Sequence, residues 1–200
     1  MGLYPCIRPC DVRAVYNARF IAISILLLTF AEGFLMSPTR LKWLLNLYPP
    51  YIGAGVRVVH LAEDFTSAEV VMPLRRWTRN YVGVHFGGSL YSMTDPFFML
   101  LVMEQLGRDY IVWDQAAHVE FIAPGKGTVR ACFEVTPAQV EEFRQQAASG
   151  APIRPELVVE VKGEDGELVA RVTKTLYIRK KKEKGGMIAA NVGKETGNAA

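Results

Sequence analysis

The chain has 200 residues, half of them hydrophobic and 22% charged, with a net charge of +3. This length suits one domain with extensions, and the composition suits a folded core and excludes a disordered chain. The sequence shows no basic stripe with interleaved aromatic residues, so we expect no nucleic-acid partner. Three cysteines without framework spacing exclude a disulfide scaffold, and three histidines without ligand spacing give no reason to expect a metal. We therefore expect no cofactor.

Residues 1–36 form an apolar leader for which three interpretations stay open. Phe20–Ala31 has no charged residue and follows three arginines. This run is shorter than the about 20 apolar residues that a membrane span needs, and its layout also suits a signal peptide. Met36 is the true start in the first interpretation. In the second, residues 14–36 are a membrane anchor or an export signal, and in the third the leader is a helix packed on the domain. We expect a cytoplasmic protein, with membrane association through residues 14–36 as the alternative.

The first predicted elements after the leader are a short helix, two strands and a long helix. Ser37–Leu47 has a helix-capping serine followed by proline, and Tyr48-Pro49-Pro50 is expected to end the helix. Val56–Met72 is dense in β-branched residues and predicts two strands. Gly88–Leu106 is the longest apolar stretch, typical of a buried helix, in which Pro96 is expected to cause a kink.

The second half of the chain predicts four strands and one helical insert. Strands are expected at Tyr110–Ile122 and Thr128–Val135, and a helix at Thr136–Ala148. Glu156–Lys162 and Glu167–Arg179 then predict a hairpin. The order indicates an α+β domain over residues 37–180, in which an antiparallel sheet wraps one long central helix. Residues 181–200 contain few large apolar residues and predict a flexible basic and polar tail.

The window from Asn80 to Asp95 contains the candidate catalytic residues. Asn80 and Gly83 precede the pair Gly87 and Gly88, and Asp95 follows the second glycine by seven residues. The unpaired amides at a helix start favour negative charge, and glycine allows a carbonyl oxygen to approach them closely. This arrangement suits stabilisation of an oxyanion, with a carboxylate farther along the same helix.

On these five positions the sequence resembles the hotdog-fold thioesterase superfamily, above all the branch of the phenylacetate-pathway thioesterases and related uncharacterised domains. The likeness in layout covers about Pro38 to Lys180. It implies a hotdog fold and the hydrolysis of an acyl-CoA or acyl-carrier thioester. The chain departs from the family at Phe86, where a histidine commonly stands, and His85 lies one position earlier.

The expected roles follow from thioester chemistry. Asp95 is the general base or the nucleophile, with a pKa raised by the apolar wall of Tyr91, Phe97 and Phe98. Asn80 holds the water or the carbonyl, and Gly88 polarises the carbonyl. The expected substrate-binding residues are Gly87, His85, Phe86, Tyr91 and Phe98.

Structural alternatives stand beside these roles. Asn80 equally suits a plain turn, the glycine pair suits a tight turn, and Asp95 suits a salt bridge beside Pro96. Phe86 in the histidine position favours a second function, a non-catalytic protein that binds or senses acyl thioesters. A third function is a hotdog dehydratase or hydratase that uses His85 and Asp95 as acid and base.

The spacing also predicts an assembly. Seven residues along one helix separate Gly88 from Asp95 by about 10 Å. One reacting carbon cannot contact both, so we expect the donor and the carboxylate at one site to come from two chains. The sequence therefore predicts a homodimer, or a dimer of dimers.

Overall fold

The computed structural model describes residues 37–182, and the predictions for the leader and for most of the tail lie outside them. The helices are α2 (Pro38–Leu47), α3 (Pro49–Ala54), α4 (Gly87–Ser92), α5 (Phe97–Leu106) and α6 (Pro137–Gln146). The strands are β1 (Arg57–Leu61), β2 (Ser67–Pro73), β3 (Tyr110–Phe121), β4 (Thr128–Glu134), β5 (Glu156–Lys162) and β6 (Leu168–Lys180). The predicted strands, the hairpin and the α+β class are confirmed, with ends shifted by one to a few residues.

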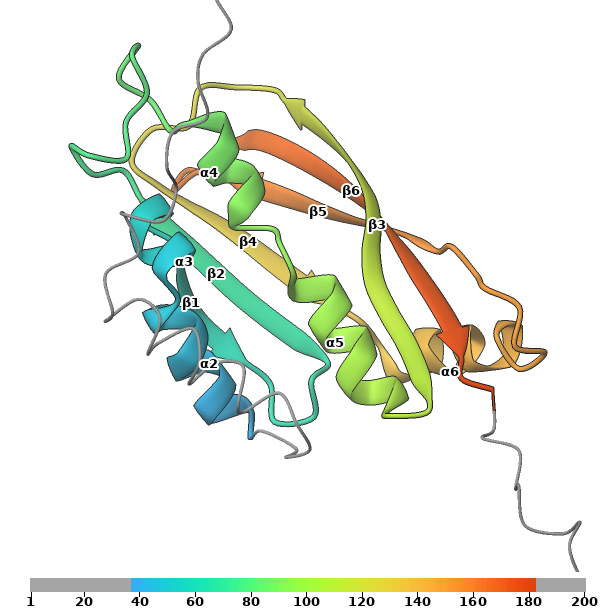
Figure 1. Ribbon diagram of the computed structural model, residues 1–200. Coiled ribbons are helices and arrows are strands. Elements are labelled where there is room, and N and C mark those ends of the chain that lie inside the picture. The colour runs from blue at the N-terminus through green and yellow to red at the C-terminus, as the bar shows by residue number, and fades with distance from the viewer. Residues whose placement is uncertain (1–36, 183–200) are drawn as a thin grey trace, which may run out of the picture. The chain divides into compact units, whose positions relative to one another are not determined.

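All six strands join one antiparallel sheet in the order β1-β2-β4-β5-β6-β3. The central helices α4 and α5 lie across one face of this sheet (Figure 1). Strand β3 is the last in the order and pairs along its length with β6. Its other edge is therefore unpaired within the part of the chain that the structure describes.

The core lies between the sheet and α5. Alternating residues of β6 point inward, so Val172, Leu176 and Ile178 are fully buried. On α5, Phe97 and Phe98 pack their rings against Phe133 of β4, with centroids 4.9 and 5.1 Å apart. This aromatic cluster fixes α5 on the sheet.

The first helical region is longer than the sequence predicted. Ser37 caps α2 by accepting a hydrogen bond from the Arg40 amide, as expected. Tyr48-Pro49-Pro50 ends this helix, as expected, but a second helix, α3, begins at Pro49. Proline is compatible with the first turn of a helix because the amides of that turn have no partner within the helix. Tyr51 of α3 is buried in the core.

The central helix is interrupted where Pro96 was expected to kink it, and the single helix expected over Gly88–Leu106 is divided into α4 and α5. α4 ends at Ser92, a turn covers Met93 to Asp95, and α5 begins after Pro96. Pro96 lacks the amide that a continuous helix needs, which explains why the interruption falls here. The rise of 1.5 Å per residue thus does not apply between Gly88 and Asp95, and the two-chain site loses that geometric support.

No helix within residues 37–182 is long and apolar enough to cross a membrane. The location of the protein stays a prediction.

Candidate functional site

A fully buried lysine lies at the centre of the candidate site. Lys174 occupies an inward position of β6, between Val172 and Leu176, and its side chain is 0% exposed. Burying an ammonium group is costly unless it is paired. Here the Nζ atom lies 2.9 Å from Asp95 Oδ1 and 2.8 Å from Asp114 Oδ2. It also donates to the Tyr91 hydroxyl at 3.3 Å, so all three partners surround one nitrogen atom.

Asp95 reaches this lysine because the helix is interrupted. The residue lies in the turn between α4 and α5, and its backbone carbonyl accepts a hydrogen bond from the hydroxyl of Tyr51. Its side chain is 46% exposed although its lysine partner is buried. The carboxylate is therefore bound to Lys174 on its buried side and exposed to solvent on its other side.

Asp114 faces the site through the ordinary alternation of β3, since Tyr110 and Val112 before it are buried, and a β-bulge follows it. Pairing with β6 shifts between Asp114 and Ala116, so that Asp114 lies opposite Leu176 and Ala117 lies opposite Lys174. A bulge reverses the alternation of side chains, since one extra residue moves the following positions to the other face. Asp114 therefore faces inward by alternation and Ala117 because of the bulge, and Asp114 Oδ1 has no hydrogen-bond partner among the described residues.

The two carboxyl groups differ in protonation behaviour. Burial on its own would raise the pKa of Asp95, but hydrogen bonds with Asp114 and Lys174, together with the lysine charge, lower it below its usual value. Burial and the hydrogen bond with Asp95 raise the pKa of Asp114 to about 6. Burial opposes the charge of Lys174, yet the two carboxylates raise its pKa to about 12. Asp95 is thus ionised at neutral pH, and the expectation that an apolar wall raises its pKa is wrong because Lys174 supplies a charged partner.

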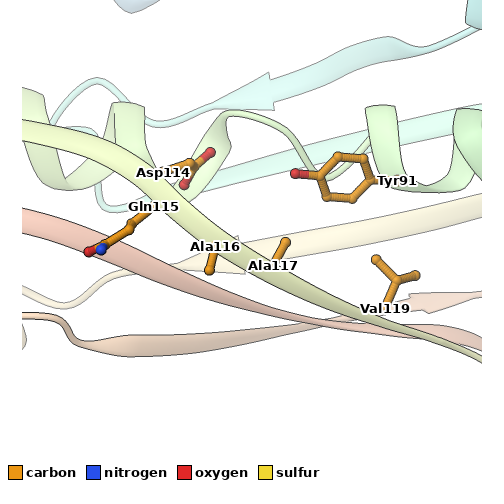
Figure 2. A pocket seen from close by; sticks show the side chains of 6 residues that line it. All are labelled: Tyr91, Asp114, Gln115, Ala116, Ala117 and Val119. Carbon is orange, nitrogen blue, oxygen red and sulfur yellow. The ribbon is translucent and has the colours of Figure 1, made fainter.

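An open pocket of about 440 Å³ lies beside the bulge. Figure 2 shows the Tyr91 hydroxyl directed toward β3, where Asp114 and the small side chains of Ala116 and Ala117 lie. Gln115 and Val119 complete the lining. The predicted substrate-binding residue Tyr91 therefore lies between this pocket and the lysine.

The glycine pair begins α4, as the sequence predicted, but aromatic rings cover it. A Cβ atom added to Gly88 would lie 2.5 Å from Cε1 of Phe86, and one added to Gly87 would lie 3.0 Å from Cζ of Phe121. Phe86 itself is 58% exposed. The absence of side chains at both glycines leaves room for these rings, which lie where a substrate carbonyl was expected to approach.

His85 does not face the pocket. It is 2% exposed, and its Nε2 atom lies 3.0 Å from the carbonyl oxygen of Gly127. Burial lowers the pKa of the imidazole, with a smaller opposing effect of the Gly127 carbonyl. His85 is therefore neutral and packs under the turn that contains Gly125.

The side chain of Asn80 stabilises the loop in which it lies. Its Oδ1 atom accepts hydrogen bonds from the amides of Val82 and Val84, and its Nδ2 atom donates to the His85 carbonyl. The structure thus favours the turn alternative for Asn80. Phe98, predicted to bind substrate, is 3% exposed and belongs to the aromatic core. Of the predicted site residues, the structure brings Asp95 and Tyr91 together, and it places His85, Asn80 and Phe98 elsewhere.

The comparisons with known proteins agree with this fold. Residues 39–178 match the model of DUF4442, a domain of unknown function. The chain belongs to this family. None of the curated proteins matches the chain.

Several solved structures are similar to the chain. A Pseudomonas aeruginosa protein of unknown function, described as a probable thioesterase, is 19% identical with a TM-score of 0.64; the match covers 74% of this chain and 100% of that one. A Haemophilus influenzae thioesterase is 16% identical with a TM-score of 0.53, over 76% of this chain and 96% of that one. A Chlorobaculum tepidum protein of unknown function is 15% identical with a TM-score of 0.59, over 72% and 98%. At these identities the likeness establishes the hotdog fold and leaves the activity to the site.

Lys174 and Asp114 are not among the site residues predicted from the sequence. Lys174 interrupts an otherwise apolar alternation, because the neighbouring inward positions of β6 are Val172 and Leu176. A lysine at such a position needs a buried acidic partner, which could have prompted a search for one. Asp114 gives a similar indication, because it continues the alternation of the inward residues Tyr110 and Val112 on β3.

Proposed function

We propose that the protein hydrolyses a thioester of an acyl group with coenzyme A or an acyl carrier. The observation that supports this proposal best is the carboxylate of Asp95. It is ionised, half exposed and held by Lys174 beside the pocket that Asp114 and Tyr91 line. A carboxylate with a fixed orientation and an open side suits attack on a carbonyl or activation of water.

Two courses of reaction fit Asp95. As a base, it takes a proton from water, whose oxygen adds to the thioester carbonyl before the carbon–sulfur bond breaks. As a nucleophile, it forms an anhydride with the acyl group, which water then cleaves. In both cases the products are a carboxylic acid and a thiol. Asp114, with its raised pKa, is placed to supply a proton to the leaving thiolate.

The carbonyl oxygen needs a donor as negative charge develops on it. The amides at the start of α4 are the candidates, with Gly87 and Gly88 as the residues that permit close approach. Phe86 covers Gly88 and is exposed at the surface, so its ring must rotate away before a substrate can reach this point.

A homodimer is part of the proposal. β3 is a 12-residue edge strand with Trp113 exposed, and a long unpaired edge favours pairing with another strand. Two copies joined along β3 would extend the sheet across a two-fold axis. Sedimentation at micromolar concentration tests this, since a monomer would contradict it. A dimer of dimers stays a further prediction.

A second function is favoured by specific observations. Phe86 lies over Gly88, and the amide of Asn80 is occupied within its own loop. Lys174 also lowers the basicity of Asp95, which weakens a general base. These features suit a protein that binds or senses acyl thioesters without cleaving them.

A panel of acyl-CoA substrates separates the two functions. Thiol release is measured for aliphatic and aromatic acyl groups, and binding is measured by calorimetry with the same compounds. Turnover that is lost in Asp95→Asn supports the hydrolase. Binding without turnover supports the sensor, and the absence of both contradicts the two proposals together.

A further inference from the structure

Exposed apolar side chains are concentrated in the loop between β2 and α4, residues 74–86. Trp77 is 70% exposed, Val82 is 76% exposed and Tyr81 is completely exposed, at 105%. Soluble surfaces rarely place large apolar groups together, and such clusters mark interaction sites. The same loop carries three exposed arginines: Arg75, Arg76 and Arg79.

The loop holds these side chains outward by its own internal contacts. Thr78 is buried, and its hydroxyl accepts from the Arg75 amide and donates to the Arg75 carbonyl. Asn80 fixes the tip by accepting hydrogen bonds from the amides of Val82 and Val84. The exposure of Tyr81 and Val82 is therefore a property of an internally bonded loop, in which the side chains of Thr78 and Asn80 bond to its own backbone.

The charged residues of this loop all have one sign. Between Glu69 and Asp95 the sequence has three arginines and no acidic residue. The helices α2 and α3 contain two basic residues, Arg40 and Lys42, and one exposed acidic residue, Glu63, contacts α2 through Thr39. The loop itself therefore favours an anionic partner.

The helices α2 and α3 also expose large apolar side chains. Trp43 and Leu47 are 65% and 61% exposed, and they lie one turn apart on α2. Ile52 of α3 is 57% exposed. The end of α3 contacts the loop, since a Cβ added to Gly55 would lie 3.0 Å from Cγ2 of Thr78. Figure 1 shows the loop projecting beyond the sheet at the end where α3 lies.

We propose that the loop 74–86, together with the exposed side of α2–α3, docks on the surface of an anionic lipid bilayer. Tryptophan and tyrosine favour the interface between headgroups and acyl chains, and arginines add attraction to anionic lipids. An exposed Val82 beside Tyr81 gains by entering an apolar phase, whereas contact with a nucleic acid would gain nothing from it. The uncharged run Phe20–Ala31, which precedes α2 in the sequence, is consistent with a protein that works at a membrane.

The three tryptophans of the chain provide a position-specific test. Trp77 lies in the loop, Trp43 on α2, and Trp113 on β3, where it stacks on Tyr177. Three full-length variants each keep one tryptophan and carry phenylalanine at the other two positions. Each is mixed with vesicles of phosphatidylglycerol and brominated phosphatidylcholine, whose bromine atoms quench tryptophans that enter the bilayer. We expect quenching of Trp77 and Trp43 and none of Trp113, which is also exposed but lies on another surface.

A charge test uses matched variants of the loop. Arg75, Arg76 and Arg79 are replaced together by glutamine, and in a control by lysine, which keeps the charge. Each basic residue near an anionic surface contributes a factor of roughly five, so the glutamine variant should partition on the order of 10²-fold less. The lysine variant should bind nearly as the parent does. Because all three side chains are exposed, circular dichroism should show both variants folded.

The results distinguish a lipid bilayer from a second copy of the chain as the partner of the loop. Equal quenching of Trp113, or none of Trp77, overturns the proposal. If Trp77 is already shielded from acrylamide without vesicles, a second copy of the chain covers the loop, and the proposal also fails. Quenching of Trp77 persists under the proposal even if the leader itself anchors the protein, because the readout reports the position of the loop.

Discussion

The two halves of the central helical segment have different tasks. α5 contributes apolar side chains such as Phe97, Phe98 and Leu101, all buried, and its role is packing. α4 and the turn after it present Tyr91 and Asp95 to Lys174 on the sheet. Because the helix is interrupted, Asp95 lies outside the regular helix and its carboxylate contacts Lys174. Packing and chemistry are thus separated within about twenty residues, and each half can be altered alone.

The largest effect is expected from Lys174→Met. This change leaves Asp95 and Asp114 close together without the cation that both contact. Removing one partner of a buried ion pair costs about 3–5 kcal/mol of the free energy of unfolding. Urea denaturation measures it, with Lys162→Met as a control, since that lysine is exposed and pairs only with Glu160 in the structure described.

A second substitution sharpens this result. Adding Asp114→Asn to Lys174→Met removes one of the two repelling carboxylates and should restore part of the lost stability. If Lys174→Met alone unfolds at the same urea concentration as the parent, the cluster does not contribute to stability as described.

A loss of similar size is expected in the packing half from Phe98→Ala. Phe98 is buried against Phe133, and removing a core phenylalanine costs about 3–5 kcal/mol through lost burial and a cavity. Phe86→Ala is the matched change in the other half, where the ring is exposed above Gly88. We expect Phe86→Ala to change KM with little effect on the melting temperature, and Phe98→Ala to do the reverse at temperatures where it is folded. An unchanged melting temperature in Phe98→Ala would contradict the core assignment.

The same division explains what the sequence could predict. The strand and helix order and the role of α5 follow from periodicity and apolar content, which local sequence encodes. The charged cluster does not, because it joins residues of α4, β3 and β6 that are up to 83 positions apart. The contact of Asp114 with Lys174 depends on the pairing of β3 with β6, and the contact of Asp95 depends on the interruption at Pro96. Local sequence encodes neither the strand pairing nor the path of the chain around Pro96.

Glycine and asparagine were harder to interpret than the core for another reason. Gly87 and Gly88 leave space that a carbonyl oxygen or an aromatic ring can fill, and the sequence does not distinguish them. Asn80 accepts and donates hydrogen bonds equally well in a turn and at a catalytic site. Only the positions of Phe86 and of the Val82 and Val84 amides separate these alternatives.

In the chemical half, Asp95→Asn tests the proposed hydrolysis. Asparagine keeps the shape of the side chain but cannot accept a proton or attack a carbonyl, so kcat should fall at least about 10²-fold. Affinity for the acyl thioester should change little, because the contacts that bind the ground state remain. Steady-state thiol release measures both parameters, with Glu104→Gln on α5 as a control that should leave them unchanged. Full turnover in Asp95→Asn would assign Asp95 to structure alone.

The smallest effect concerns the pH dependence of stability. The groups that face Asp114 are Lys174 of β6, Asp95 of the turn and Tyr91 of α4, and the folded protein raises the pKa of Asp114 from 3.8 to about 6. Below pH 3.8 this carboxyl is protonated in both the folded and the unfolded chain. Between pH 3.8 and about 6 the unfolded chain loses the proton first, which lowers the free energy of unfolding as the pH rises. The lowered pKa of Asp95 acts in the opposite direction, but at lower pH. The parent should therefore lose stability relative to Asp114→Asn across this window, by roughly 1 kcal/mol per pH unit. Urea denaturation of both proteins at a series of pH values measures the difference, and a difference that does not vary with pH would mean that Asp114 is ionised throughout.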